Sequence, residues 1–504
     1  MTPTTQALAL TIASLLHPPA YAHASFGLAV YDLDRNRLLY AVAANRLYDP
    51  ASTTKLLTAG TALAALGPDF RFTTPVYRTG AIDAQGTLHG DLVLVASGDA
   101  NLSQRIQPDG SLSFENEDHA YDGSPDTKAV PGDPLAVLRD LARQVYAQGV
   151  RRVTGRAIVD ASLFPDAGTE NGTGTDVAPI VVNDNVVDVI VAPGKNAADP
   201  AIVRSISPAT PYATFVNQAT TGAPHSDSTL TMTDADDGNG NRVVTLTGAV
   251  ASTDPPTLYA YRVTSPKRFA EDAFTLALRD AGVAIENPAP DPPSFDRTAY
   301  AASYQPANLV AKHVSPPLSE DVRITLKVSD NLHADLLPYV VGIYAGKAKG
   351  PDALQAGFDV ERDFLTKLHL DLSGAAQQDG AGTAAFTPLF MVHYLAAIRQ
   401  QPWFDDFYRG LPILGVDGTL APIQTKAPAR GFVFAKTGTD GMGNDLSGGE
   451  VVAKGLAGYT TTRRGHHVAF CVYIGNAVYP HGVGGSQEAG QVNGAIANAI
   501  YLDE

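Results

Sequence analysis

Apolar and polar positions alternate near the N-terminus in a way that predicts a β-hairpin. Residues 25–31 and 37–42 have the period of two that is typical of strands, and Asp34-Arg35-Asn36 separates them as a turn. Residues 50–66 follow, rich in Leu and Ala, and they end at Gly67-Pro68, a pair that stops helices. We therefore expect a hairpin followed by a buried helix.

The middle of the chain, from about residue 72 to about residue 306, has a different pattern. Many short apolar runs, such as residues 92–95 and 243–246, are separated by clusters of Gly, Asp, Asn and Pro. Two patches with helical periodicity, residues 134–148 and 266–281, interrupt these runs. The pattern predicts a β-rich accessory region.

Helical periodicity returns in the last third of the chain, and three strands and a final helix follow it. The predicted helical segments are residues 318–341, 388–400 and 487–501, and the predicted strands are residues 431–435, 452–460 and 467–474. These three strands and the N-terminal hairpin can form one antiparallel sheet. The middle of the chain would then be an insertion into the domain that contains this sheet.

The domain organisation follows from these patterns and from the length. A chain of 504 residues is too long for one ordinary domain. We expect an α/β (α+β) domain of residues 1–73 and 307–504, with its antiparallel sheet flanked by helices. Residues 74–306 are expected to form the inserted β-rich region, as two nested domains with the inner one at about residues 186–253.

Composition and charge exclude some classes of function. Hydrophobic residues make up 44% and charged residues 17%, as in globular proteins. The net charge of −16 argues against nucleic acid or an anionic membrane surface as a partner, because either would require a basic patch. No phosphate loop or dinucleotide fingerprint is found, so we expect no cofactor.

The N-terminus and the single cysteine give little information on the compartment. Residues 7–16 are apolar and Ala20-Tyr21-Ala22 resembles a signal-peptidase site, but the first basic residue is Arg35. We expect residues 6–16 to form a short helix that packs on the sheet, and no stretch reaches the length of a transmembrane helix. Cys471 stands in an apolar run and is expected to be a small core residue rather than a reactive thiol.

The first chemical motif is Ser52-Thr53-Thr54-Lys55. The spacing of three places Lys55 one helical turn after Ser52, within reach of its hydroxyl. A neutral lysine can take the proton of a serine hydroxyl, which requires burial and a nearby cation to lower its pKa. An isolated Ser and Lys at this spacing would more often be surface residues, but the flanking residues here are apolar.

The second motif, Ser329-Asp330-Asn331, lies between two predicted helical runs. One interpretation is a helix break with an N-cap, a common use of these residue types. The other is catalytic: Ser329 would pass a proton to a leaving nitrogen, and Asn331 would hydrogen-bond Lys55 or a substrate amide. The two interpretations are compatible, because a cap residue can also be catalytic.

The third motif is Lys436-Thr437-Gly438-Thr439, expected at the end of the strand of residues 431–435. Gly438 would let a ligand approach the backbone, and Thr437 and Thr439 share one face of the strand, suited to holding a carboxylate. Lys436 would supply positive charge near Lys55. A solvated strand end is the alternative.

The three motifs in this order resemble those of the class C low-molecular-mass penicillin-binding proteins, the D-Ala-D-Ala carboxypeptidase/endopeptidase group. The long separation of Ser52 from Ser329 also matches, because members of that group carry extra domains between the first two motifs. Further matching segments are residues 49–59, 315–332 and 415–420, and Gly98-Asp99.

The resemblance implies a penicillin-binding/β-lactamase-like fold and a role for each motif residue. Ser52 would be the acylated nucleophile, Lys55 the base, and Ser329 and Asn331 the second motif. The motif of Lys436, Thr437, Gly438 and Thr439 would bind the terminal carboxylate, and the N–H groups of Ser52 and Thr439 would form the oxyanion hole. The implied substrates are peptidoglycan stem peptides ending in D-Ala-D-Ala, with β-lactam antibiotics as acylating mimics, and the implied location is extracytoplasmic.

Two segments depart from the group's pattern. Residues 379–385 read Asp-Gly-Ala-Gly-Thr-Ala-Ala, so that Ala381 and Ala385 replace a serine and an arginine that are usual in the group. Asp379 is retained and is expected to bind substrate. The stretch Phe164-Pro165-Asp166-Ala167-Gly168-Thr169 lacks the group's aromatic residues. We expect a loosened or altered specificity for the residue that precedes D-Ala-D-Ala.

Two other functions are compatible with the motifs. A β-lactamase would need a deacylating base, and the class A pattern of Glu followed four residues later by Asn fails at Glu361, which has Leu365 at that offset. A non-catalytic cell-wall-binding scaffold is the second alternative. A metal site is not expected, because the neighbouring His466 and His467 on a strand would point to opposite faces.

Overall fold

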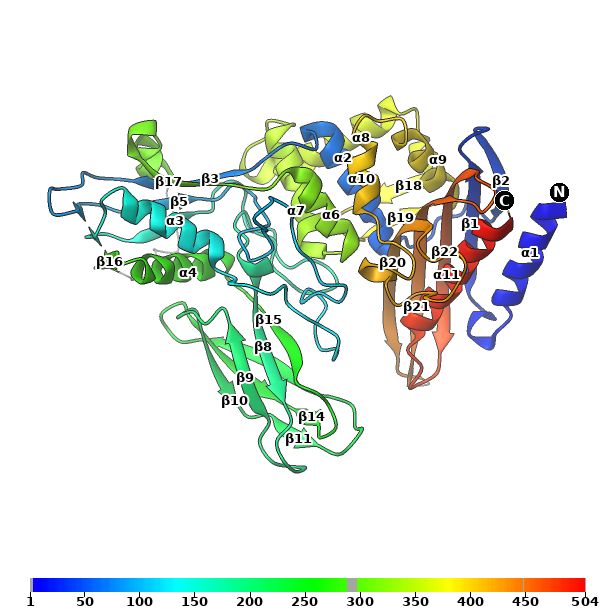
Figure 1. The fold of residues 1–504 in the computed structure, drawn as a ribbon, viewed down its shortest axis with the longest axis horizontal. Helices are drawn as coiled ribbons and strands as arrows, with labels where there is room; N and C mark the ends of the chain where they lie inside the picture. Colours follow the sequence, from blue (N-terminus) through cyan, green and yellow to red (C-terminus); the bar gives the residue numbers. More distant parts are fainter. Residues whose placement is uncertain (1–2, 288–296, 447, 504) are drawn as a thin grey trace. The chain divides into compact units, whose positions relative to one another are not determined.

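The computed structural model describes residues 3–287, 297–446 and 448–503, and the chain forms two compact units (Figure 1). Unit 1 comprises Met1–Phe70, Leu318–Ala348 and Asp352–Glu504, and unit 2 comprises Arg71–Pro317 and Lys349–Pro351. Unit 1 is therefore built from both ends of the chain.

Among the described residues, unit 1 contains five strands of six residues or more and eight α-helices. The helices are α1 (Pro3–Leu15), α2 (Lys55–Leu66), α6 (Leu318–Lys327), α7 (Asn331–Tyr344), α8 (Ala353–Lys367), α9 (Pro388–Ile398), α10 (Phe404–Gly410) and α11 (Gly485–Asp503). The strands are β1 (Ser25–Asp32), β2 (Arg37–Val42), β18 (Ala375–Gln377), β19 (Ala384–Phe386), β20 (Val433–Asn444), β21 (Gly449–Thr461) and β22 (His467–Tyr479).

The expected sheet from both chain ends is confirmed. Its strand order is β2-β1-β22-β21-β20, and every neighbouring pair is antiparallel. β1 lies inside the sheet with Leu28 opposite Val472, so the N-terminal hairpin is joined directly to the last strand. β20, which carries the third motif, is an edge strand.

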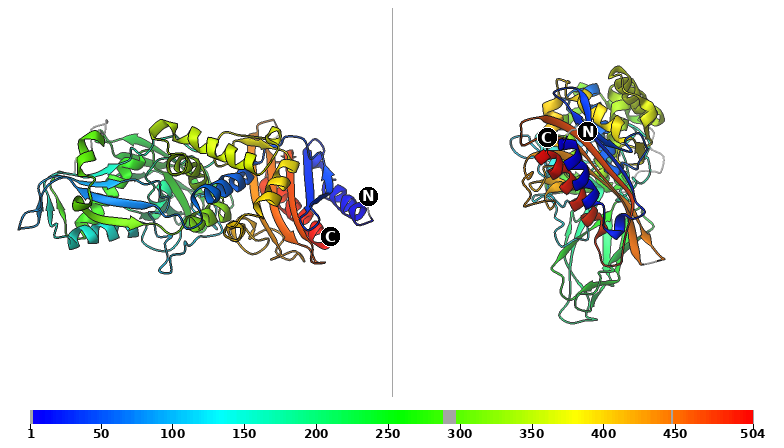
Figure 2. Two further views of the ribbon diagram at one scale, coloured as in Figure 1. Left: turned by 90° about the horizontal axis from the view of Figure 1, so that it is seen from above. Right: turned by 90° about the vertical axis from the view of Figure 1, so that its right-hand side faces the viewer.

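Helices cover both faces of this sheet. α11 packs on β20, β21 and β22, and α1 packs against α11, with Leu8 and Ile12 of α1 in the same core as the strand residues (Figures 1 and 2). Alternate residues of β1 and β22, such as Val30 and Phe470, are fully buried in the core on this side together with Ile496 and Ile500 of α11. α9 covers the other face against β1 and β22. The buried apolar run around Cys471 is thus explained, because both of its faces are covered.

Two local predictions for unit 1 need correction. Ser52 lies in a 3-10 turn, Ala51–Thr54, and the α-helix begins only at Lys55, because Ala51 has the left-handed φ of 43°. The third motif lies inside β20 rather than at a strand end: the strand continues to Asn444 because its Gly-rich second half still pairs with β21.

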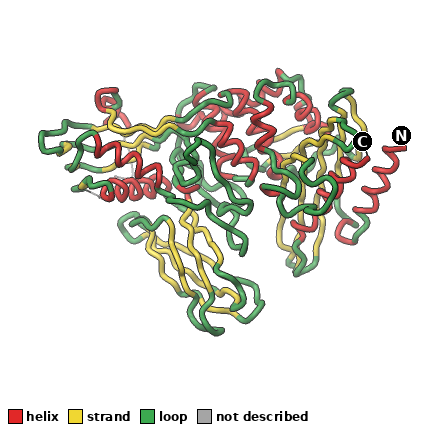
Figure 3. The backbone as a smooth tube through the Cα atoms, in the orientation of Figure 1, coloured by secondary structure: helices red, strands yellow, loops and turns green. Residues whose placement is uncertain are grey.

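Unit 2 is richer in strands, as expected (Figure 3). Its helices are α3 (Ala136–Ala147), α4 (Pro266–Asp280) and α5 (Arg297–Tyr300). Its strands are β3 (Thr73–Arg78), β4 (Thr87–Leu88), β5 (Leu92–Val95), β6 (Arg152–Val153), β7 (Ala157–Asp160), β8 (Val186–Ala192), β9 (Ile202–Ser207), β10 (Ala213–Asn217), β11 (Thr220–Gly222), β12 (Thr231–Asp236), β13 (Arg242–Thr247), β14 (Ala249–Ala251), β15 (Thr257–Arg262), β16 (Ala284–Ile285) and β17 (Leu309–Val314).

The main sheet of unit 2 has the order β17-β3-β5-β7, and α3 and α4 pack on it. Because β17 pairs with β3, the segment of residues 309–314, expected in the first domain, lies in unit 2. A second, smaller core gathers residues of β8, β13 and β15, among them Val189, Leu246 and Tyr259. That residues 186–253 form a nested domain of their own stays a prediction.

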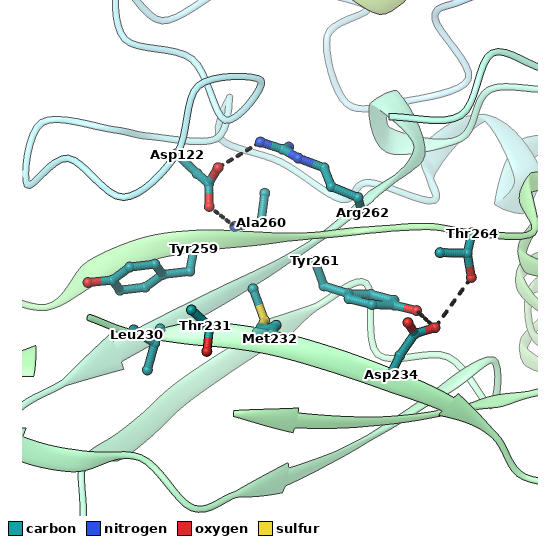
Figure 4. A pocket seen from close by; sticks show the side chains of 10 residues that line it. All are labelled: Asp122, Leu230, Thr231, Met232, Asp234, Tyr259, Ala260, Tyr261, Arg262 and Thr264. Atoms are coloured by element: carbon teal, nitrogen blue, oxygen red, sulfur yellow. Dashed lines mark hydrogen bonds and ion pairs between the residues drawn. The ribbon is translucent and has the colours of Figure 1, made fainter. Parts of the chain in front are cut away.

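A cavity of about 350 Å³ in unit 2 lies beside β12 and β15, which are edge strands of two separate sheets (Figure 4). Its charged groups are already paired. Arg262 donates to Asp122 over 2.6 Å, and the Tyr261 hydroxyl donates to Asp234 over 2.8 Å. Among the described residues, no helix is both long enough and apolar enough to cross a bilayer.

A buried carboxyl group lies beneath helix α2. Glu361 of α8 is only 6% exposed and neighbours Thr61 of α2, and burial raises its pKa to about 7. The folded state therefore holds this proton more tightly than the unfolded chain does. The free energy of unfolding should fall as the pH rises from about 4.5 to about 7, and it should then stay level.

Replacing Glu361 by Gln should stabilise the protein at pH 8 and change little at pH 4.5, because an amide has no ionisation cost. A shift of this size corresponds to roughly 3 kcal/mol. Urea unfolding at both pH values measures the difference. Asp363→Asn, an exposed change on the same helix, serves as the control. Equal effects of Glu361→Gln at the two pH values would show that ionisation is not the cause.

Candidate active site

The structure brings the three sequence motifs together inside unit 1. Ser52 and Lys55 come from the start of α2, Ser329 and Asn331 from the junction of α6 with α7, and Lys436 from β20. These five side chains are linked by direct hydrogen bonds. The predicted catalytic set is therefore one cluster in space.

Lys55 is the centre of this cluster and has no exposed surface. Its Nζ donates to Ser52 Oγ over 2.7 Å and to Asn331 Oδ1 over 2.5 Å. The carbonyl oxygen of Ala381 accepts a third, longer bond of 3.3 Å, and Ser329 Oγ lies 3.5 Å away. These acceptors fix the amine against the hydroxyl of Ser52, as an activating base must be placed.

The second motif combines the two roles considered for it. Asp330 caps α7, because its side chain accepts the backbone N–H of His333 over 3.1 Å. Ser329, one residue earlier, has the left-handed φ of 66°, which is costly for a residue with a Cβ. This conformation turns the Ser329 hydroxyl toward the two lysines. Asn331 begins α7 and faces Lys55.

Lys436 is the second buried amine of the cluster, and it too has no exposed surface. Its Nζ donates to Ser329 Oγ over 2.8 Å and to the carbonyl oxygen of Thr437 over 2.9 Å. Burial, and then the positive charges of Lys55 and Lys454, hold the pKa of Lys436 well below its ordinary value. Ser329 thus stands between two amines and can relay a proton between them.

Gly438 makes room for another part of the chain, and that it also lets a ligand approach the backbone stays a prediction. A Cβ at this position would lie 2.3 Å from the carbonyl oxygen of Pro50. The Pro50 carbonyl, in the segment that carries Ser52, therefore lies close against the backbone of β20 at Gly438. Of the flanking threonines, Thr437 donates to the hydroxyl of Thr419 over 2.7 Å, and Thr439 accepts from Lys454 over 2.5 Å.

Asp379 organises the loop behind Lys55. Its Oδ1 accepts the backbone N–H groups of Ala381, Gly382 and Thr383 at 2.7 to 3.0 Å. This holds the Ala381 carbonyl against Lys55, while the Ala381 side chain is only 2% exposed. A direct contact of Asp379 with substrate stays a prediction.

Two charged groups of the site were not singled out from the sequence. Asp49 accepts the N–H of Ala51 over 2.8 Å, and burial, with the neighbouring carboxyl group of Asp440, raises its pKa to about 6. Lys454 of β21 contacts Thr439. The signal for Lys454 was present as a lone cation in an apolar strand, but only the register of β20 with β21 shows which motif residue it faces.

The group of residues in unit 2 that most resembles a metal site is a closed ion network. Arg105 pairs with Asp118 over 2.7 Å and with Asp184 over 2.5 Å. His119 contacts Asp184 through Nε2 and Asp188 through Nδ1. Burial lowers the pKa of His119, but the surrounding carboxylates outweigh it and hold that pKa well above the ordinary value. Asp118, His119 and Asp184 each place one ligand atom within 4.8 Å of the others.

Comparison of the sequence with known proteins gives one consistent result. The family model described as "D-Ala-D-Ala carboxypeptidase 3 (S13) family" matches residues 8–491. A D-alanyl-D-alanine carboxypeptidase of Actinomadura sp. (strain R39) is 28% identical over 476 residues, which cover 90% of this chain and 80% of that protein. The D-alanyl-D-alanine carboxypeptidase DacB of Haemophilus influenzae is 24% identical over 471 residues, with 89% and 85% covered.

The fold also has a solved counterpart. The crystal structure of penicillin binding protein 4 (dacB) from Haemophilus influenzae aligns with a TM-score of 0.72 at 20% identity, and the alignment covers 100% of both chains. A second structure of that protein, complexed with a novel β-lactam, aligns with a TM-score of 0.70 at 22% identity and covers 98% of this chain and 99% of that one. The penicillin-binding-protein-like fold expected from the motifs is confirmed.

The strained backbone at Ser329 can be separated from its hydroxyl by two substitutions. Ser329→Ala and Ser329→Gly both remove the hydroxyl, but only glycine is free of strain at this φ. We expect the glycine variant to be more stable than the alanine variant by about 1 kcal/mol. Urea unfolding measures this difference, and equal stability of the two variants would refute the strain.

Both Ser329 variants should also lose reactivity at Ser52, because the link between the two lysines is broken. We expect acylation or phosphonylation of Ser52 by a serine-reactive reagent to slow by about 100-fold. Mass spectrometry of the intact protein over time gives the rate. An unchanged rate would show that the hydroxyl takes no part in proton movement.

Proposed function

The chain belongs to the D-Ala-D-Ala carboxypeptidase 3 (S13) family, and on that premise we propose that Ser52 is the nucleophile with which it hydrolyses peptidoglycan stem peptides ending in D-Ala-D-Ala. The observation that supports this assignment most directly is the 2.7 Å hydrogen bond between Lys55 Nζ and Ser52 Oγ. The surrounding buried cluster supports an activated hydroxyl there.

In the acylation step the Ser52 hydroxyl loses its proton to the neutral amine of Lys55. Ser52 Oγ forms a bond to the carbonyl carbon of the penultimate D-Ala. A neutral Lys55 is favoured because Lys436 is linked to it through Ser329, and two buried ammonium groups so close together repel each other. The developing oxyanion would accept the backbone N–H groups of Ser52 and Thr439.

Collapse of the tetrahedral intermediate breaks the bond from carbon to nitrogen. The leaving amine of the terminal D-Ala needs a proton, and we assign its delivery to the Ser329 hydroxyl, which contacts Lys436. Ser329 in turn takes from its neighbour Lys55 the proton that came from Ser52, so that Lys55 is neutral again. Asn331 holds Lys55 in place throughout. Water then cleaves the ester on Ser52, with Lys55 accepting the proton of the water and returning one to Ser52 Oγ.

The edge of strand β20 is proposed as the binding site for the substrate backbone and its terminal carboxylate. Thr437 and Thr439 present their hydroxyls on one side of this strand. β-Lactams carry a strained amide and a carboxylate in a similar relation, so they should acylate Ser52. Endopeptidase cleavage of peptide cross-links would use the same residues.

Specificity for the residue before D-Ala-D-Ala is proposed to be loose. Ala385 of β19 offers no charge where the group usually has an arginine, and Ala381 is buried and cannot contact a stem-peptide side chain. Strong kinetic selection for a diaminopimelate-like free terminus would contradict this. Because peptidoglycan lies outside the cytoplasm, we further propose an extracytoplasmic location for the protein.

The proposal is tested with benzylpenicillin and intact-protein mass spectrometry. Wild type should form a persistent adduct of one drug molecule, and it should release D-Ala from a D-Ala-D-Ala peptide. Ser52→Ala should form no adduct and lose hydrolysis by at least about 1000-fold. Ser205→Ala, a change at an exposed serine of β9, is the control and should behave as wild type.

Other outcomes would favour the alternatives. Rapid loss of the drug without an adduct would indicate a β-lactamase, because deacylation would then be fast. No adduct and no drug loss would favour a non-catalytic cell-wall-binding scaffold. An adduct that persists in Ser52→Ala would refute the assignment of the nucleophile.

A further inference from the structure

Lys454 lies beside the proposed carboxylate site, and none of the three motifs includes it. It is paired with Thr439 across the antiparallel strands β20 and β21. Its Nζ donates to Thr439 Oγ1 over 2.5 Å and to Ser486 Oγ of α11 over 3.0 Å. An amine is therefore fixed directly against the last threonine of the third motif.

The side chain of Lys454 is held in place along its length. Gly490 of α11 lies beside the stem of Lys454, because a Cβ on Gly490 would be in ordinary van der Waals contact with Lys454 Cε at 3.4 Å. Asn493 of the same helix donates to the Lys454 carbonyl oxygen. The ammonium is thus positioned by α11 and by Thr439, unlike the mobile end of a surface lysine.

The ammonium of Lys454 has hydroxyl partners but no ion pair with a carboxylate among the described residues. The carboxyl group of Glu450, on the same strand, acts on the charge of Lys454, but its Oε1 accepts the N–H of Gly485 at the start of α11. A cation held by two neutral hydroxyls at the edge of a binding strand has capacity for an anionic ligand.

We propose that Lys454 binds the α-carboxylate of the leaving D-Ala, together with the hydroxyl of Thr439, and so makes a free carboxylate beside the leaving amine a requirement for the substrate. The inference rests on the proposed function. Thr439 Oγ1 accepts from Lys454 and can donate its own proton to the carboxylate. The carboxylate of a β-lactam would occupy the same place, so Lys454 is a specificity-determining residue for both kinds of acylating molecule.

Binding of the carboxylate by Lys454 should depend on pH, because the groups around Lys454 determine the pH at which it loses its charge. Burial lowers the pKa of Lys454 to about 8, and the negative charge of Glu450 opposes the shift. Lys436 is the neighbouring cation, from β20, and α11 contributes the neutral Ser486. Asp440 is next to Thr439 on β20 but interacts with Asp49, whose pKa is raised to about 6. Loss of the Lys454 charge above about pH 8 should therefore weaken binding of the carboxylate.

The test compares two probes that react covalently with Ser52 of the full chain: benzylpenicillin, which acylates it and carries a carboxylate, and a neutral alkyl fluorophosphonate, which phosphonylates it and carries none. Lys454→Met should slow acylation by benzylpenicillin by about 10- to 100-fold at pH 7. Because the charge of Lys454 also helps to lower the pKa of Lys436, the reaction with the fluorophosphonate should change too, but by much less than the reaction with benzylpenicillin. The control Lys426→Met, at an exposed lysine of the same unit, should affect neither. With D-Ala-D-Ala peptides, the loss should be in KM rather than in kcat.

The pH profile gives a second readout. In wild type, the rate with benzylpenicillin divided by the rate with the fluorophosphonate should fall as the pH rises through about 8. In Lys454→Arg this ratio should stay high above that pH, because arginine stays charged. Equal slowing of both probes in Lys454→Met would overturn the proposal by showing a general structural role. Slowing of neither would overturn it as well. Wild type that reacts with neither probe would instead refute the proposed function, independently of Lys454.

Discussion

The structure of unit 1 depends on the burial of two lysine amines, Lys55 and Lys436, beside the hydroxyl of Ser329. Lys55 and Lys436 have no exposed surface, and both lie within reach of Ser329 Oγ. Removing an ammonium group from water is expensive unless its hydrogen bonds are replaced. The fold replaces them with groups from separate parts of the chain, including the Asn331 side chain and the Ala381 carbonyl. The elements that supply these acceptors cannot shift without leaving a buried amine without its hydrogen bonds.

This constraint explains several features that are unfavourable by themselves. Ala51 and Ser329 both adopt left-handed backbone conformations, one on each side of Lys55. Gly438 lacks a side chain so that the Pro50 carbonyl can approach β20. The carboxylate of Asp379 accepts backbone N–H groups of the loop that follows it, and this holds the Ala381 carbonyl toward Lys55. The strain is local, and the packing of helices on the sheet holds it in place.

Much of unit 1 could be predicted from the sequence because its signals are local. The hairpin of β1 and β2, the buried run around Cys471 and the spacing of Ser52 and Lys55 all follow from short-range patterns. Three aspects could not be predicted in this way. The extent of β20 past Gly438 depends on pairing with β21, since its glycines have low strand propensity. The 3-10 turn at Ser52 depends on tertiary packing around Ala51. The contact of Lys454 with Thr439 depends on register, which single-strand patterns do not contain.

The place of β1 within the sheet has a consequence for the order of folding. β1 pairs on one side with its neighbour β2 and on the other with β22, which leaves the ribosome long after β1 and after all of unit 2. Unit 2 is almost continuous in sequence, so its hydrophobic cores can form before β22 has been synthesised. The strands that pair in unit 1, such as β1 and β22, are far apart in the sequence. Unit 1 therefore has a high contact order, and it is expected to fold slowly. Until then the nucleophile and its partners exist only as separated segments, and the chain is synthesised without a working site.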